Sequence, residues 1–324
     1  FGVSQVRPSF ARQGSVCARN DTMLMTRGIL RLILPAIAAA GFPAAAIAND
    51  DKPFSLVLSA GAEHDSNVAV EQTDTVSLRG DALAVLEADA KYRLEPAQNL
   101  SLTAGYDFEQ TLHAEFSAFD MQTHTLSLGL EQRLGATSLA ADYSFMHILL
   151  GGSGFLDMHQ ISPSVSGFAA KAIYLRGSFT YTDKNFKTAN AFDARNYQVG
   201  ADAYYFMMHN KAYVSLTGRY EVEDTTGTEL AYKGFQLGAN LQVPVSSAKV
   251  KLGYAYRQRL YDNVTVSIAD RRHETRSVIK LSADVPLLGE LSFKPEFRYI
   301  DRQSNYQPAN YREYVETGAF SYRF

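Results

Sequence analysis

Few residues of this sequence have types and spacings that suit catalysis or metal binding. The seven histidines are scattered, and no two have a spacing typical of metal ligands, so we predict no metal site. The run from Gly151 to Gly154 lacks the Gly-x-Ser-x-Gly spacing of a nucleophile elbow and is expected to be a loop. Asp65, Asn67 and Asp262 fall in predicted loops, where Asx residues form turns more commonly than calcium sites. We therefore expect neither an enzyme nor a cofactor.

Charged residues are abundant, and most of them recur at alternate positions of extended segments. Alternate side chains of an extended chain share a face, so these charges are predicted to line one side of a sheet while apolar residues cover the other. Mixed charges of this kind could tune a channel. They could equally form an ion-pair network that closes and rigidifies a barrel. The predicted lumen-lining residues are Lys91, Arg93, Asp107, Glu109, Glu131, Asp142, Arg176, Asp202, Arg219, Glu221, Lys251, Arg257, Lys280, Asp284, Lys294, Glu296 and Arg298.

The elements that would carry these charges are strands. From residue 52 onward about fourteen segments alternate apolar and polar residues over the length that a tilted membrane strand needs. Short turns are predicted at 95–99, 135–137, 167–170, 208–210, 244–247 and 286–290. Long polar loops alternate with them, at 65–81, 113–121, 147–157, 183–195, 223–231, 262–274 and 301–310. We predict an all-β fold: a single closed antiparallel transmembrane β-barrel of about 14 strands, with both termini in the periplasm.

A soluble fold fits the pattern less well. A β-propeller has a similar repeat length, but its usual Trp-Asp signature is absent because the sequence contains no Trp. Some residues fit a barrel poorly as well. Pro163 and Pro295 fall inside predicted strands, where local bulges would accommodate them. Glu316 falls on the lipid-facing side, which predicts either a register shift or a protected seam.

The first 48 residues are expected to lie outside the barrel. Arg27 and Arg31 flank the start of an apolar stretch that ends in Ala46-Ile47-Ala48, the pattern of a secretory signal peptide cleaved between Ala48 and Asn49. A permanent membrane helix is the alternative. We assign 1–22 to an upstream non-structural segment, 23–48 to the signal peptide and 49–324 to the barrel. Cys17, the only cysteine, would be lost with the leader, which excludes disulfides and thiol chemistry from the mature chain.

The last strand indicates where the chain goes. Phe320, Tyr322 and Phe324 share one face, and the sequence ends on the last of them. This pattern resembles the closing strand of bacterial outer-membrane β-barrels. The resemblance implies a Gram-negative outer membrane as the location, its lipids as surroundings and the barrel-assembly machinery as the partner that reads these aromatic residues.

A second resemblance concerns the first strand. It continues into Gly61-Ala62-Glu63-His64-Asp65-Ser66-Asn67-Val68. This turn is similar to the Tyr-Asp-Ser-Asn-Val-like turn in the barrel domain of surface lipoprotein assembly modifiers and related porin-like barrels, with His64 in place of the usual Tyr. The resemblance implies delivery of a secreted or surface (lipo)protein, and it covers 52–324 in architecture but only these residues in motif.

Transport across the outer membrane is the function that these observations favour. We expect a channel for small polar solutes. An export barrel for a surface (lipo)protein and a structural or adhesive barrel with a closed lumen are the alternatives. Nucleic acid is not an expected partner, because the formal net charge is −3.

Overall fold

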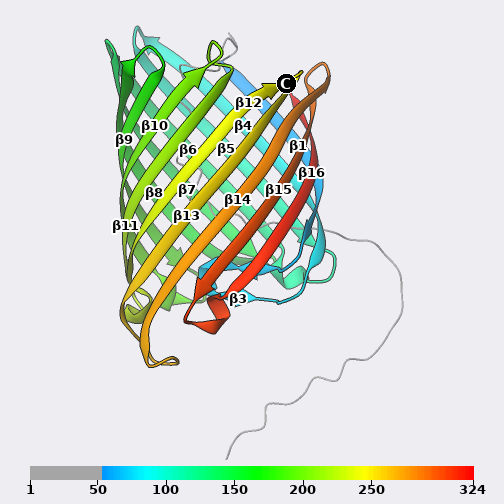
Figure 1. Ribbon diagram of the computed structural model, residues 1–324, viewed down its shortest axis with the longest axis vertical. Helices are drawn as coiled ribbons and strands as arrows, with labels where there is room; N and C mark the ends of the chain where they lie inside the picture. The colour runs from blue at the N-terminus through cyan, green and yellow to red at the C-terminus, as the bar shows by residue number, and fades with distance from the viewer. Residues whose placement is uncertain (1–52) are drawn as a thin grey trace, which may run out of the picture.

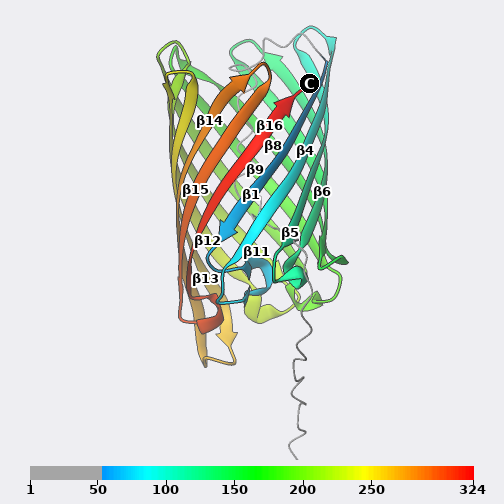
Figure 2. The same ribbon diagram turned by 90° about the vertical axis from the view of Figure 1, so that its right-hand side faces the viewer.

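The computed structural model describes residues 53–324, which form one closed antiparallel barrel of fourteen strands (Figures 1 and 2). Successive strands are neighbours, and β1 closes the barrel by pairing with β16. The strands are β1 (Phe54–Asp65), β4 (Asp81–Ala97), β5 (Leu100–His113), β6 (Met121–Leu134), β7 (Thr137–Leu150), β8 (Ser153–Ala170), β9 (Ile173–Phe186), β10 (Ala194–Met207), β11 (Ala212–Thr225), β12 (Tyr232–Val245), β13 (Ala248–Thr265), β14 (Asp270–Leu288), β15 (Leu291–Ser304) and β16 (Tyr311–Arg323). The predicted fold class and strand number are confirmed. The leader and its cleavage site lie outside the described residues.

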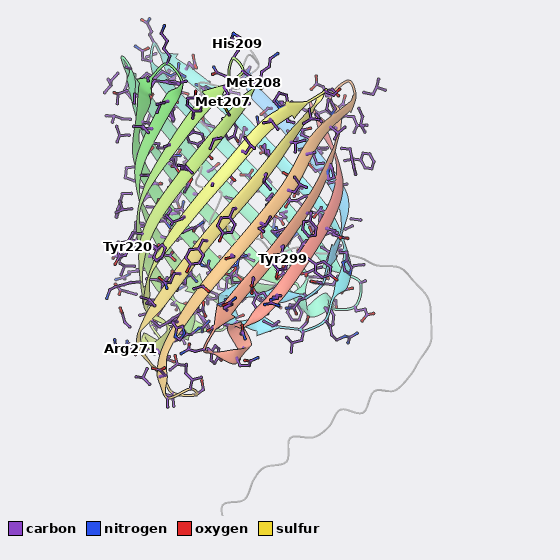
Figure 3. The ribbon with its side chains drawn as sticks, in the orientation of Figure 1. Met207, Met208, His209, Tyr220, Arg271 and Tyr299 are labelled. Atoms are coloured by element: carbon purple, nitrogen blue, oxygen red, sulfur yellow. The ribbon has the colours of Figure 1, made fainter. Side chains whose placement is uncertain are left out.

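The two ends of the barrel differ. One end, the turn end, carries the tight turns, and the backbone N–H of Phe324 there donates to the carbonyl of Leu56 at 2.9 Å. The opposite loop end carries the short elements β2 (Ala69–Val70), η1 (Glu71–Thr73), β3 (Thr75–Val76), η2 (Ser117–Phe119), η3 (Asn190–Phe192), η4 (Thr228–Leu230) and η5 (Gln307–Ala309). In Figure 3, Met208 and His209 mark the turn end and Arg271 the loop end. That the turn end faces the periplasm stays a prediction.

Strand alternation gives the barrel an apolar outer wall. Leu128, Val199 and Leu216 are each more than half exposed, a costly arrangement in water but a favourable one in lipid. Closure gives the strand backbones hydrogen-bonding neighbours on both sides, which hydrocarbon surroundings require. Within residues 53–324, no helix has the length and hydropathy needed to cross a membrane.

The two prolines do not create the predicted bulges. Pro163 pairs with Ala141 of β7, and Pro295 pairs with Gly318 of β16. On its other side, Pro163 interrupts the pairing with β9, and Pro295 interrupts the pairing with β14. In both cases the residues before and after the interruption keep the same register. A proline removes one N–H donor on one side of the strand, so each strand keeps its neighbour on the other side.

The predicted seam around Glu316 is also corrected. β15 and β16 pair without a register shift, and Glu316 lies opposite Phe297 and His64 on the outer face, exposed. Arg312 and Tyr314 share that face of β16, nearer the loop end. The outer wall is therefore polar here, which lowers the cost of a charge compared with the middle of the apolar band.

Several predicted loops are shorter than expected. Only Gly151 and Gly152, both with positive φ, connect β7 to β8, so the predicted loop 147–157 is mostly strand. The predicted loop 262–274 is likewise reduced to the turn between Thr265 and Asp270. Strands can continue their hydrogen-bonded ladder beyond the lipid with polar side chains on both faces, and this removes the hydrophobic alternation by which a strand is recognised.

Candidate functional site: the lumen and its inserted loop

The connection between β1 and β4 folds into the loop end of the barrel. We call residues 66–80 the inserted loop; it contains β2, η1 and β3 (Figure 1). Asp65 starts it with an Asx turn, its Oδ1 accepting the Asn67 N–H at 2.8 Å, so the turn reading of this motif is confirmed. Val68 and Val70 are each only 1% exposed. A loop that buries two valines inside a barrel is part of the lumen.

Glu71 at the tip of this loop forms ion pairs with the barrel wall. Its carboxylate contacts Arg257 of β13, and its Oε2 lies 3.5 Å from Nη2 of Arg276 of β14. Burial raises the pKa of Glu71, but the surrounding guanidinium groups, with Arg257 first, outweigh it and hold that pKa well below the usual 4.5. Glu71 therefore stays ionised.

Asp74, at the other end of the same short helix, makes a second pair of contacts. Its two carboxylate oxygens lie 2.7 Å from Nη1 of Arg272 and 2.7 Å from Nη2 of Arg302. Glu274 joins the same group, accepting from Nη2 of Arg302 at 2.9 Å. Arg272 and Arg302 are almost fully buried, and buried charges need such partners. The inserted loop supplies one of the two carboxylates that these arginines contact, and β14 supplies the other.

The opposite wall of the loop end is apolar. Residues of β6, β7, β8 and β9 form one buried cluster, and Val70 of the inserted loop belongs to it. The cluster contains Val70, Met121, Met146, Ile148, Phe155, Leu156, Met158 and Phe186. The inserted loop thus spans the lumen, with carboxylates on an arginine wall and a valine on a methionine-rich wall.

A cavity of about 80 Å³ lies where these walls meet. Glu71, Gln72 and Asp74 of the inserted loop line it together with both walls. A smaller cavity of about 20 Å³ lies beside it, between the loop and β1, β15 and β16. The inserted loop lines both of these narrow spaces.

The predicted lumen-lining residues all fall on one face of the sheet. The cross-strand pairings place them on the same face as Arg257. The side chain of Arg257 reaches the inserted loop, so this face is the inner one. The ion pairs are Lys91 with Asp89, Arg93 with Glu95, Glu131 with Arg133, Arg176 with Asp142, Arg219 with Asp202, Arg259 with Glu221, and Lys280 and Arg298 with Glu296. Lys294 donates to Ser321, and Asp107, Glu109, Lys251 and Asp284 lie on the same face. Their role in transport stays a prediction.

The most buried of these ion pairs lies on β10 and β11. Nη2 of Arg219 donates to both carboxylate oxygens of Asp202, at 2.7 and 3.0 Å, and both side chains are buried. Toward the turn end, aromatic side chains follow on the same face. Tyr204 and Phe206 stack in parallel at 6.1 Å, and Tyr213 lies 5.9 Å from Tyr204. This part of the inner wall offers aromatic rings beside charged groups.

The sequence reading missed the residues that bind the inserted loop. Arg272, Glu274 and Arg302 fall in the predicted loops 262–274 and 301–310, and Arg276 was not assigned to the lumen, because no apolar alternation marks that part of the chain. A signal was present: 272, 274 and 276 carry charges at alternate positions, as the recognised strands do. Glu71 and Asp74 gave no such signal, since nothing local distinguishes a loop that folds inward.

Among residues 53–324, no group of three or more His, Cys, Asp or Glu is arranged to hold a metal ion. Phe320, Tyr322 and Phe324 lie on the outer face at the turn end, each exposed, and the rings of Tyr322 and Phe324 are 4.7 Å apart. Their recognition by an assembly machinery stays a prediction.

Comparison with known proteins places the fold. The sequence matches no protein-family model, and no curated protein matches it. An anion-selective porin from Comamonas acidovorans superposes over 84% of this chain and 98% of its own, with a TM-score of 0.52 and 8% identity. OmpT, an outer membrane protein of Vibrio cholerae, superposes over 85% of this chain and 99% of its own, with a TM-score of 0.50 and 10% identity. The protein has the fold of an integral outer-membrane β-barrel of the porin type.

Proposed function

We propose that this protein is an outer-membrane channel for small polar solutes, and that the inserted loop restricts its loop end. The observation that carries the proposal is the polar inner wall beyond the loop. Lys280 pairs with Glu296 at 2.7 Å, yet its side chain remains 40% exposed, and that of Asp142 is 55% exposed. Charged side chains inside a barrel that retain this exposure line a space that water can fill. The porin-type fold agrees with this reading.

Single-channel conductance tests it. Protein purified from outer membranes and placed in a planar bilayer should show openings, and Arg219→Glu or Lys280→Glu should shift ion selectivity toward cations. The shift is expected because each change replaces an inward positive charge by a negative one next to an existing carboxylate. Arg312→Glu, an exposed position on the outer face, is the matched control. A folded barrel with no openings, even without the inserted loop, would contradict the proposal.

A closed structural or adhesive barrel is the second candidate. The network of ion pairs and the inserted loop favour it, because both fill the lumen and would rigidify it. Export of a surface (lipo)protein rests on the resemblance of residues 61–68 alone. That the protein is not an enzyme is also based on the sequence alone and remains a prediction.

A further inference from the structure

The cavity beneath the inserted loop has two chemically different walls. One is cationic and contains Arg257, Arg259, Arg272 and Arg302. The other is apolar and contains Met146, Ile148, Leu156, Met158 and Phe186. We propose that the channel binds amphipathic monocarboxylates here, with the carboxylate on the arginines and the hydrocarbon part on the methionine-rich wall. This inference rests on the proposed channel function and names its solute class.

The inserted loop itself shows that the arginine wall accepts carboxylates. Asp74 lies 2.7 Å from both Arg272 and Arg302, in the charge-assisted geometry that a bound solute would use. Glu71 makes the same kind of contact with Arg257 and Arg276. The loop carboxylates therefore occupy the positions that a solute carboxylate needs. A solute of this class has to take the place of the loop, which makes the loop a competitor and the solute an opener.

The arginine wall also has unused donors. Arg302 is 2% exposed, and its Nε and Nη1 have no hydrogen-bond partner among residues 53–324. The hydroxyl of Tyr232, in the same cavity and equally buried, has none either. Leaving buried donors unpaired costs free energy, so each such group in a native protein calls for a partner, and a bound ligand can supply it. Both unpaired groups line the same cavity and are available to the oxygens of an anion bound there.

The apolar wall selects against fully hydrated anions. Met146 and Met158 are each less than 10% exposed, inside a barrel whose inner face is otherwise largely polar. Methionine side chains adapt to ligands of different shape, and burying hydrocarbon against them is favourable in proportion to its area. A carboxylate with no apolar part would gain only the arginine contacts, against which Glu71 and Asp74 already compete. An alkylammonium ion would meet the arginines with the wrong charge.

The test uses three probes on the full protein in lipid nanodiscs and planar bilayers: hexanoate, acetate and hexylammonium. Hexanoate should bind at concentrations tenfold or more below acetate and should increase channel opening, whereas hexylammonium should do neither. Arg302→Gln should weaken hexanoate binding by roughly tenfold, the value of one charged hydrogen bond. Met158→Gln should weaken hexanoate but not acetate, and Arg312→Gln on the outer face should change nothing.

The outcomes separate the inference from the function on which it rests. Equal effects of hexanoate and acetate would overturn the role of the apolar wall, and equal effects of hexanoate and hexylammonium would indicate membrane partition only. If Arg302→Gln does not fold, Met158→Gln still decides. A variant with 68–77 replaced by a short Gly-Ser linker should pass neutral sugars into liposomes. Passage without hexanoate binding would reject the solute class and keep the channel, and no passage would reject both.

Discussion

Asp74 and Arg302, 228 positions apart in the sequence, form an ion pair of 2.7 Å inside the barrel. Asp74 lies in a loop whose ends are fixed by β1 and β4, whereas Arg302 lies on β15, two strands beyond β1 in the closed sheet. The pair therefore ties the inserted loop to the opposite side of the closing seam. Breaking it, together with the pairs of Glu71, should release the loop without disturbing the strands.

The first prediction concerns this release. Glu71→Gln combined with Asp74→Asn should increase the open fraction of single channels, because the loop loses its ion pairs to four wall arginines. Removing one partner of a buried pair costs about 3 kcal/mol, a change of roughly 100-fold in the ratio of closed to open states. Glu229→Gln, an exposed carboxylate of η4 outside the inserted loop, is the control. Unchanged conductance would show that the ion pairs do not hold the loop.

The second prediction concerns pH. Because the pKa of Glu71 is held well below 4.5 when its carboxylate is among the arginines, its contribution to the closed state is complete above 4.5. That contribution is lost only as the pH falls through the lowered pKa. Protonation of Glu71 should therefore not change channel opening between pH 7 and pH 5. It should increase opening only in stronger acid. The acid response should be reduced in Glu71→Gln; an unaltered response would assign it to other groups.

A third prediction concerns the closing seam, which Figure 2 shows where β1 meets β16. A Cβ atom added to Gly61 would lie 2.7 Å from both the Cβ of Ala319 and the carbonyl oxygen of Gly318. Gly61→Val should therefore destabilise the folded barrel by about 1–3 kcal/mol, the usual cost of overpacking. The lost stability should appear as a lower unfolding temperature, measured as the temperature at which the folded band disappears from a heat-modifiability gel. Gly218→Val, whose Cβ would meet only Leu237 at 4.0 Å, should leave that temperature nearly unchanged.

The fourth prediction concerns the terminal aromatic residue. Phe324 is 55% exposed on the outer face, so Phe324→Ala removes little packing and should refold normally in detergent. In cells the same variant should reach the outer membrane at a several-fold lower level if the assembly machinery reads this side chain. Phe54→Ala, an exposed aromatic residue of β1 at the same end of the barrel, is the control. Equal membrane levels for both variants would remove the assembly role.

Much of the fold could be read from the sequence because strand alternation is a local property. Each membrane strand has to place apolar residues toward lipid and polar residues inward, so its inner charges, such as Arg219 and Lys280, are visible in the sequence. The strand extensions between 147 and 157 were missed because this alternation is required only where a strand crosses the lipid. Outside the lipid, both faces of a strand can be polar, and the local signal disappears although the backbone pairing continues.

The sequence by itself determined the strand number, the closed antiparallel barrel and the inner or outer face of the residues in the strand segments that it marks by alternation. Only the tertiary structure decided that residues 66–80 fold inward. That choice depends on Glu71 and Asp74 meeting arginines about 200 positions later in the chain, and on Val70 meeting methionines of β7 and β8. Such pairings are set by where the closed sheet brings distant strands. No periodicity along the chain records them, because each partner is an ordinary polar or apolar residue in its own neighbourhood.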